Sequence, residues 1–87
     1  MSMYRKNALN QLKLTFEEFL EEYKDELSSQ EAFNLAKEYE IETWKEQLES
    51  YKDNAEKTGF NVKDAIKICK TMINELSKVK TSDLLNK

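Results

Sequence analysis

The sequence has no proline and only one glycine among its 87 residues. Sheet-rich folds need these residues at their turns, so their near absence argues against a fold built of strands. Good helix formers, namely Glu, Lys, Leu, Gln and Ala, are abundant instead. We therefore predict an all-α protein, a small antiparallel bundle of three to five helices that spans residues 1–87 as a single domain.

Histidine is absent, and cysteine occurs once, at Cys69. Without histidine, catalytic triads, zinc sites and imidazole pH switches are largely excluded. A single glycine cannot build a phosphate-binding loop or a nucleophile elbow. We therefore expect no enzymatic activity, no cofactor and no metal site. Since one cysteine forms no internal disulfide, the sequence fits a reducing compartment.

Long apolar runs are missing as well. No stretch reaches the roughly 18 apolar residues that a membrane span needs. The basic start at Arg5 and Lys6 is not followed by the apolar segment of a signal peptide. The sequence therefore predicts a cytoplasmic protein without a membrane partner.

The first half of the chain predicts two helical segments before residue 28. A weak helix is expected at about 3–13, and a strongly amphipathic one at about 15–27, where Thr15 and Glu18 have the spacing of a capping box. The heptad spacing of Leu9, Phe16 and Tyr23 equally allows one continuous helix. The sequence does not decide between these alternatives.

A long helix is expected over residues 30–57, because Ser28 and Glu31 form a second capping box. Its apolar residues change side along the helix by about 150°. Either the helix breaks near Ile41, which we favour slightly, or one helix buries different faces against different neighbours. Gly59 then marks a helix stop, with Phe60 placed to pack back on the last turn.

The last long helix is predicted at residues 62–79, with Asn61 as its N-cap and an apolar stripe that contains Cys69. Cys69 is therefore expected to be a small buried hydrophobe rather than a reactive thiol. Residues 81–87 are polar and are expected to fray, with Leu84 as a possible anchor.

A run of carboxylates on the helix at 15–27 is the first candidate site. It consists of Glu17, Glu18, Glu21, Glu22 and Asp25. The run is either a solvated face that keeps the protein soluble or a docking surface for a basic partner, for example one that mimics a nucleic-acid backbone. A metal site is disfavoured, because the glycine-centred calcium loop is absent.

Three aromatic residues of the long helix are further candidates: Tyr39, Trp44 and Tyr51. Such a stripe is usually core, yet Trp and Tyr are also enriched in binding hot spots. On one straight helix Tyr39 cannot share a face with Trp44. One of the two faces is therefore available for another chain, and a structural homodimer is one alternative reading of the sequence.

A row of lysines on the last helix, namely Lys63, Lys67, Lys70 and Lys78, is the alternative candidate site, for nucleic acid. Residues 31–41 resemble the first half of a bacterial helix-turn-helix, which implies a DNA-binding regulator. The resemblance then fails, because Glu40 replaces the usual glycine of the turn. The basic residues are also 13 Lys to one Arg, and bidentate recognition of phosphates and bases relies on Arg.

The overall composition favours a macromolecule-binding module that acts by occlusion of another protein. The Lys-rich, Arg-poor chain is similar in size and acidity to phage-encoded inhibitors of host enzymes, such as anti-CRISPR proteins. Charge is also divided along the sequence. Residues 1–60 carry 14 acidic and 8 basic side chains, whereas residues 61–87 carry 3 acidic and 6 basic ones. This division favours a surface with an electrostatic role.

Overall fold

The computed structural model describes residues 3–59 and 62–85, and within these ranges the chain is helical without strands. The helices are α1 (Met3–Glu22), α2 (Ser29–Thr58), α3 (Lys63–Lys78) and α4 (Thr81–Leu85). The prediction of an all-α fold is therefore confirmed. None of the described helices is both long and apolar enough to cross a membrane.

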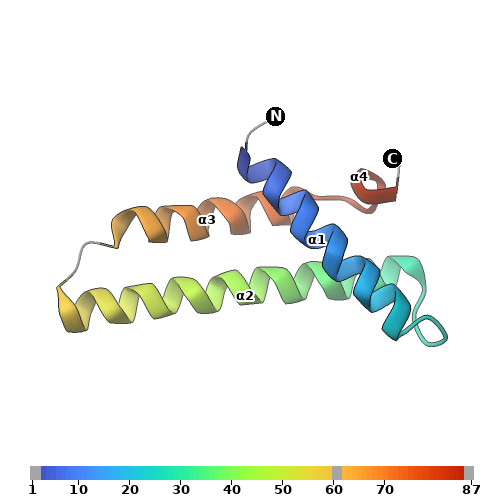
Figure 1. Cartoon of the computed structure of the whole chain (residues 1–87), viewed down its shortest axis with the longest axis horizontal. Helices are drawn as coiled ribbons and strands as arrows, with labels where there is room; N and C mark the ends of the chain where they lie inside the picture. Colours follow the sequence, from blue (N-terminus) through green and yellow to red (C-terminus); the bar gives the residue numbers. More distant parts are fainter. Residues whose placement is uncertain (1–2, 60–61, 86–87) are drawn as a thin grey trace.

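The four helices form two regions of different thickness (Figure 1). α3 runs antiparallel to α2, and α1 crosses both at one end, where α4 also lies. We call this part the three-helix end. The remaining part consists of residues 45–58 of α2, beyond Trp44, and the first turns of α3. α1 does not cross this helical hairpin (Figure 1), although Tyr4 of α1 lies beside Ile68, and we call it the two-helix arm.

The arm makes the molecule long and thin. The whole molecule measures 48 × 29 × 15 Å. Its radius of gyration is 14.9 Å, whereas a compact chain of this length has a radius of gyration of about 12 Å. The accessible surface is 6229 Å², about 900 Å² more than a compact monomer of this mass exposes. A large part of the helical surface therefore has no intramolecular cover.

The hydrophobic core lies entirely in the three-helix end. Phe16 of α1 and Phe33 of α2 meet edge to face at its centre, with ring centroids 5.9 Å apart. The buried cluster consists of Ala8, Leu12, Phe16, Ala32, Phe33, Ala36, Met72, Leu76, Val79 and Leu84. It takes side chains from all four helices, so the crossing of α1 is what seals the core.

α1 is continuous from Met3 to Glu22, so the structure has the continuous helix of the two alternatives that the sequence left open, and the helix ends before Leu27. Thr15 is not a cap. It is buried in mid-helix, and its hydroxyl donates a hydrogen bond to Oε2 of Glu40 at 3.0 Å. The continuous alternative holds because one side of α1 packs on α2 and α3 along most of its length.

α2 is also unbroken, so the favoured break near Ile41 is wrong. The Ser28–Glu31 capping box is confirmed at its start. Thr43 does not cap a new helix; its hydroxyl donates to the carbonyl of Tyr39 at 2.9 Å, inside the helix. The apolar pattern changes side because α2 buries its first half against α1 and α3, and its second half against α3 alone.

The helix stop at Gly59 is confirmed. Gly59 adopts a left-handed conformation with φ of 73°, and its N–H donates to the carbonyl of Ala55 at 3.0 Å. The predicted roles of Phe60 and Asn61 lie outside the described residues. α3 follows as expected, within one residue of the predicted bounds at each end.

The C-terminal segment is ordered rather than frayed through residue 85, which corrects the prediction. Nζ of Lys37 donates to the carbonyls of Ser77 at 3.0 Å and Val79 at 2.9 Å. Arg5 pairs with Asp83 at 3.2 Å, and Thr81 donates to the side chain of Gln30 at 2.8 Å. We call these contacts the C-terminal clasp. The clasp was not predictable, because it joins residues that lie far apart in the sequence.

Candidate binding surfaces

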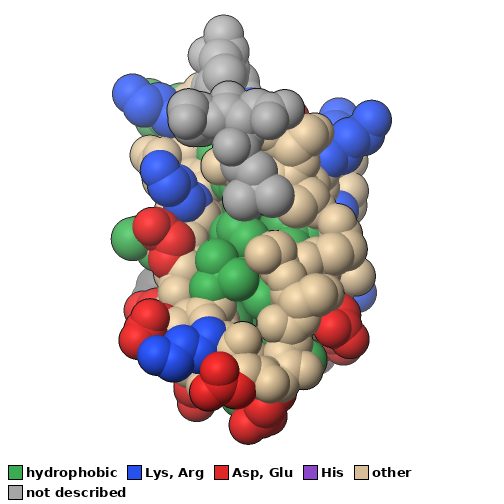
Figure 2. Space-filling model, turned by 90° about the vertical axis from the view of Figure 1, so that its right-hand side faces the viewer, with side chains coloured by type: hydrophobic (Ala, Val, Ile, Leu, Met, Phe, Trp, Pro, Cys, Tyr) green, Lys and Arg blue, Asp and Glu red, His purple; other side chains and the backbone are tan. Residues whose placement is uncertain are grey.

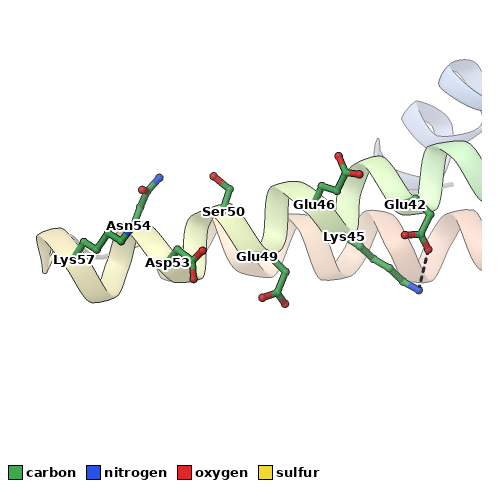
Figure 3. A pocket seen from close by; sticks show the side chains of 8 residues that line it. All are labelled: Glu42, Lys45, Glu46, Glu49, Ser50, Asp53, Asn54 and Lys57. Carbon is green, nitrogen blue, oxygen red and sulfur yellow. Dashed lines mark ion pairs between the residues drawn. The ribbon is translucent and has the colours of Figure 1, made fainter.

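The outer face of α2 is polar and has no facing wall (Figure 3). The side chains that line its shallow hollow all come from this one helix, between Glu42 and Lys57. Lys45 pairs with Glu42 at 3.6 Å along the helix. An open face of this kind does not enclose a small molecule. Within residues 3–59 and 62–85, His, Cys, Asp and Glu side chains do not gather in groups of three or more that could hold a metal ion.

The predicted acidic run of α1 forms a surface around an exposed leucine. Leu14 is 65% exposed, and with the four glutamates that follow it on the helix it lines a shallow depression. We call this set the α1 acidic surface; it consists of Leu14, Glu17, Glu18, Glu21 and Glu22. Asp25, predicted with them, lies beyond α1 in the turn at residues 23–26 and is exposed. The sequence pattern did not single out Leu14, because the Thr15–Glu18 spacing places a helix start directly after it, whereas α1 runs through this position unbroken.

The acidic surface lies on the side of α1 that faces away from the core. Leu12 and Phe16, which flank Leu14 in the sequence, are buried, with 0% and 3% exposed. At about 100° per residue, Leu14 points about 160° away from both. The exposure of Leu14 is therefore a direct result of how α1 packs. Leu14 could be buried within this chain only if α1 were rotated about its axis.

Tyr39 is the one predicted aromatic residue that the structure brings to α1. It is 56% exposed, and its ring meets Phe19 of α1 edge-on, with centroids 5.9 Å apart. Phe19 also contacts Tyr23 at 6.0 Å. Phe19 thus fixes the Tyr39 ring in one orientation at the crossing of α1 and α2, while more than half of the side chain remains open to solvent.

Carboxylates surround this aromatic contact on both helices. On α1, Glu22 lies about 60° from the direction of Phe19, and on α2, Glu42 and Glu46 lie about 60° and about 20° from the direction of Tyr39. All three glutamates are exposed. Glu22 of α1 and Glu42 and Glu46 of α2 therefore place negative charge around Tyr39.

Trp44 and Tyr51 belong to a different part of the molecule. Trp44 is half-buried and packs against the core, and Tyr51 lies further along in the two-helix arm with 36% of its surface exposed. The expectation that Tyr39 and Trp44 lie on different faces is thus confirmed. The predicted site is divided, because Tyr39 joins the acidic residues and the other two aromatics do not.

The lysine row lies on α3, where Lys67 also borders Tyr4 of α1. Lys63, Lys67 and Lys70 are exposed and line a shallow groove together with Thr71, Asn74 and the half-buried Ile66. We call this set the α3 basic groove. Lys78, also exposed, lies at the last turn of α3 beyond the groove. None of the residues that line the groove is acidic.

The two charges are separated in space as well as in sequence. Seen from the three-helix end, acidic side chains gather around the lower part of the molecule and basic ones lie mostly in the upper part (Figure 2). Apolar side chains are visible between them. Because α2, on the lower side, carries eight acidic and four basic side chains and α3, on the upper side, carries the lysine row, the molecule has an electrostatic polarity across its width.

The perturbed titratable groups serve structural roles. The hydrogen bonds from the backbone and side chain of Ser28 lower the pKa of Glu31, and the bond from the backbone N–H of Lys80 lowers the pKa of Asp83. Burial raises the pKa of the Cys69 thiol, so the thiol stays protonated near neutral pH. None of these three groups lies in the α1 acidic surface or the α3 basic groove.

The structure contradicts the helix-turn-helix interpretation. Residues 31–51 lie in one unbroken helix, so no turn separates a first helix from a recognition helix. Comparison of the chain with protein-family models, with curated proteins and with solved structures finds no match. The surfaces described above are therefore the features that bear on the function.

Proposed function

We propose that the protein is a binding module that docks on a basic surface of another protein and acts by occlusion. The observation that carries this proposal is the pair of exposed anchors, Leu14 and Tyr39, set among exposed carboxylates of α1 and α2. Exposed leucine or tyrosine side chains alone are common on soluble proteins. What favours a binding role is that each anchor has exposed carboxylates beside it, Leu14 in the α1 acidic surface and Tyr39 at the crossing of α1 and α2.

The apolar anchors and the carboxylates would have different roles in such a contact. Tyr39 and Leu14 would enter apolar pockets of the partner and supply affinity, since buried Tyr anchors are typical hot spots. The carboxylates would steer the approach of a basic partner and reject acidic ones. Phe19 holds Tyr39 in edge contact, so the ring loses little further freedom on binding.

A partner that normally binds nucleic acid fits this surface best. Closely spaced carboxylates offer it the charge of a phosphate backbone, and an apolar anchor at their centre offers affinity that a nucleic acid lacks. A phage-type inhibitor of a host nucleic-acid-binding or defence enzyme is one protein of this class, and the size, acidity and Arg-poor composition of the chain support it.

The test compares two triple charge reversals that change the net charge equally. The first, Glu18→Lys/Glu21→Lys/Glu22→Lys, lies in the α1 acidic surface. The control, Glu49→Lys/Asp53→Lys/Glu56→Lys, lies on exposed positions of the arm. The wild type is used to capture partners from the native host, and the affinity of the captured protein is then measured for the wild type and for both variants. We expect the first variant to lose at least about tenfold in affinity at an unchanged melting temperature, and the control to retain binding. Equal affinities of the two variants for the captured protein would contradict the proposal.

A further inference from the structure

The α3 basic groove has a complementary surface on the same chain. The groove has one apolar residue, Ile66, among three lysines. The α1 acidic surface has one apolar residue, Leu14, followed by four glutamates. We propose that the α3 basic groove of one molecule binds the α1 acidic surface of a second copy.

The composition of the groove favours this occupant over a nucleic acid. Phosphates would meet the lysines but would leave Ile66 without an apolar contact, whereas Leu14 of a second copy supplies one. The groove also contains no arginine, the side chain best suited to phosphate oxygens. Charge complementarity and the paired apolar residues together select the second copy.

The spacing of the two sets along their helices is compatible. Lys63, Lys67 and Lys70 span seven steps of α3, about 10 Å, and Leu14 to Glu21 span the same length of α1. Each set is exposed and lies on a regular helix, so the two can meet as a helix pair without a change of backbone.

The contact joins two different surfaces of the chain, one on α3 and one on α1. A contact of this kind is heterologous, and association proceeds head to tail until a ring closes or a chain grows.

The contact is small and therefore weak. It involves about two turns of each helix, below the roughly 800 Å² per partner of a standard interface, and its charges are exposed to salt. We expect association at high protein concentration and low ionic strength. It is independent of the proposed function, but it would cover the same α1 acidic surface and so compete with the partner.

The experiment is sedimentation velocity at concentrations from about 10 μM to about 2 mM, at about 50 mM and about 500 mM salt. For the wild type we expect the average mass to rise above 10.3 kDa with concentration, and to fall back at high salt. The variants Lys63→Glu/Lys67→Glu/Lys70→Glu and Glu18→Lys/Glu21→Lys/Glu22→Lys should each remain monomeric. The control Lys45→Glu/Lys52→Glu/Lys57→Glu, with the same change of charge on α2, should still associate.

Mixing the two monomeric variants supplies the decisive readout. Each retains one wild-type surface, so the acidic surface of one can bind the basic groove of the other, and the mixture should regain the association that each variant lacks alone. All variants change exposed side chains, and circular dichroism confirms their folding.

Three results would overturn the proposal. The first is a wild type that stays monomeric over the whole range, and the second is a mixture that stays monomeric. The third is binding of a labelled DNA duplex that the Lys63→Glu/Lys67→Glu/Lys70→Glu variant loses, in a wild type that does not self-associate. That result would assign the groove to nucleic acid. Loss of self-association leaves partner capture by the α1 acidic surface untouched, so the two proposals fail separately.

Discussion

The three-helix end and the two-helix arm use the same kind of helix and reach different degrees of burial. In the three-helix end, Leu12, Ala36 and Leu76 are fully buried. In the arm, apolar residues such as Leu48 of α2 and Ile66 of α3 are only half-buried. The difference is the third layer, because two helices cover at most one side of each apolar stripe, and α1 is needed to cover the rest.

The comparison also separates stability from surface chemistry. The core cluster and the C-terminal clasp lie in the three-helix end, where Lys37 ties the end of α3 to α2. The arm carries much of the charged outer face of α2 and the first lysines of the α3 basic groove. The three-helix end therefore stabilises the fold. The arm extends the charged surface beyond it and contributes few buried residues.

The largest expected effect is a core truncation at each region. Leu76→Ala removes a side chain with 0% exposure, and we expect it to lower the free energy of unfolding by about 2–5 kcal/mol, because it leaves a cavity that the core cannot fill. Leu48→Ala, in the half-buried arm, should cost about 1–2 kcal/mol. Urea midpoints of the two variants measure the difference, and equal losses would show that the arm is packed as tightly as the three-helix end.

A smaller effect is expected from the clasp. Lys37→Met keeps the length of the side chain and removes the two hydrogen bonds to the carbonyls of Ser77 and Val79, so we expect a loss of about 1–2 kcal/mol. Lys45→Met, on the exposed Lys45–Glu42 pair, should change stability by no more than about 0.5 kcal/mol. Thermal unfolding compares the two. A Lys37→Met variant as stable as Lys45→Met would mean that the clasp is dispensable.

The smallest effect concerns acid stability at the start of α2. The hydrogen bonds from Ser28 hold the pKa of Glu31 below 4.5, so the folded state binds its proton less tightly than the unfolded state. This contribution is present above pH 4.5 and is lost as the pH falls through the lower folded pKa. Glu31→Gln should therefore flatten the fall in stability below pH 4.5, whereas Glu56→Gln in the arm should leave it unchanged. Urea unfolding at a series of pH values decides, and identical profiles for Glu31→Gln and the wild type would contradict the capping role.

Local patterns predicted the features that depend on neighbours in the sequence. The Ser28–Glu31 capping box, the Gly59 stop and the buried Cys69 were all read correctly, because each depends on a few adjacent residues or on one helical stripe. The Thr15 cap failed for a related reason. Its spacing satisfies the same local rule as Ser28, but the burial of Thr15 against α2 outweighs the rule.

The candidate site was only partly predictable. The exposure of the carboxylates of α1 and the lysines of α3 followed from amphipathic periodicity. The contact between Phe19 and Tyr39 did not, because it joins two helices across 20 positions of sequence. Leu14 was missed since its exposure depends on which side of α1 the core occupies, and the mistaken helix start concealed that side.

By itself the sequence determined an all-α chain with strong helices, a glycine stop and separated charges, since helix propensity, capping and periodicity are local properties. The tertiary structure decided that α1 and α2 are unbroken, that the last residues are clasped, and that half of α2 remains without a third layer. These outcomes depend on which faces meet. The physical reason is that an apolar stripe stabilises a helix only when another helix packs on it. The sequence shows where the stripe lies, but it does not show which helix packs on it.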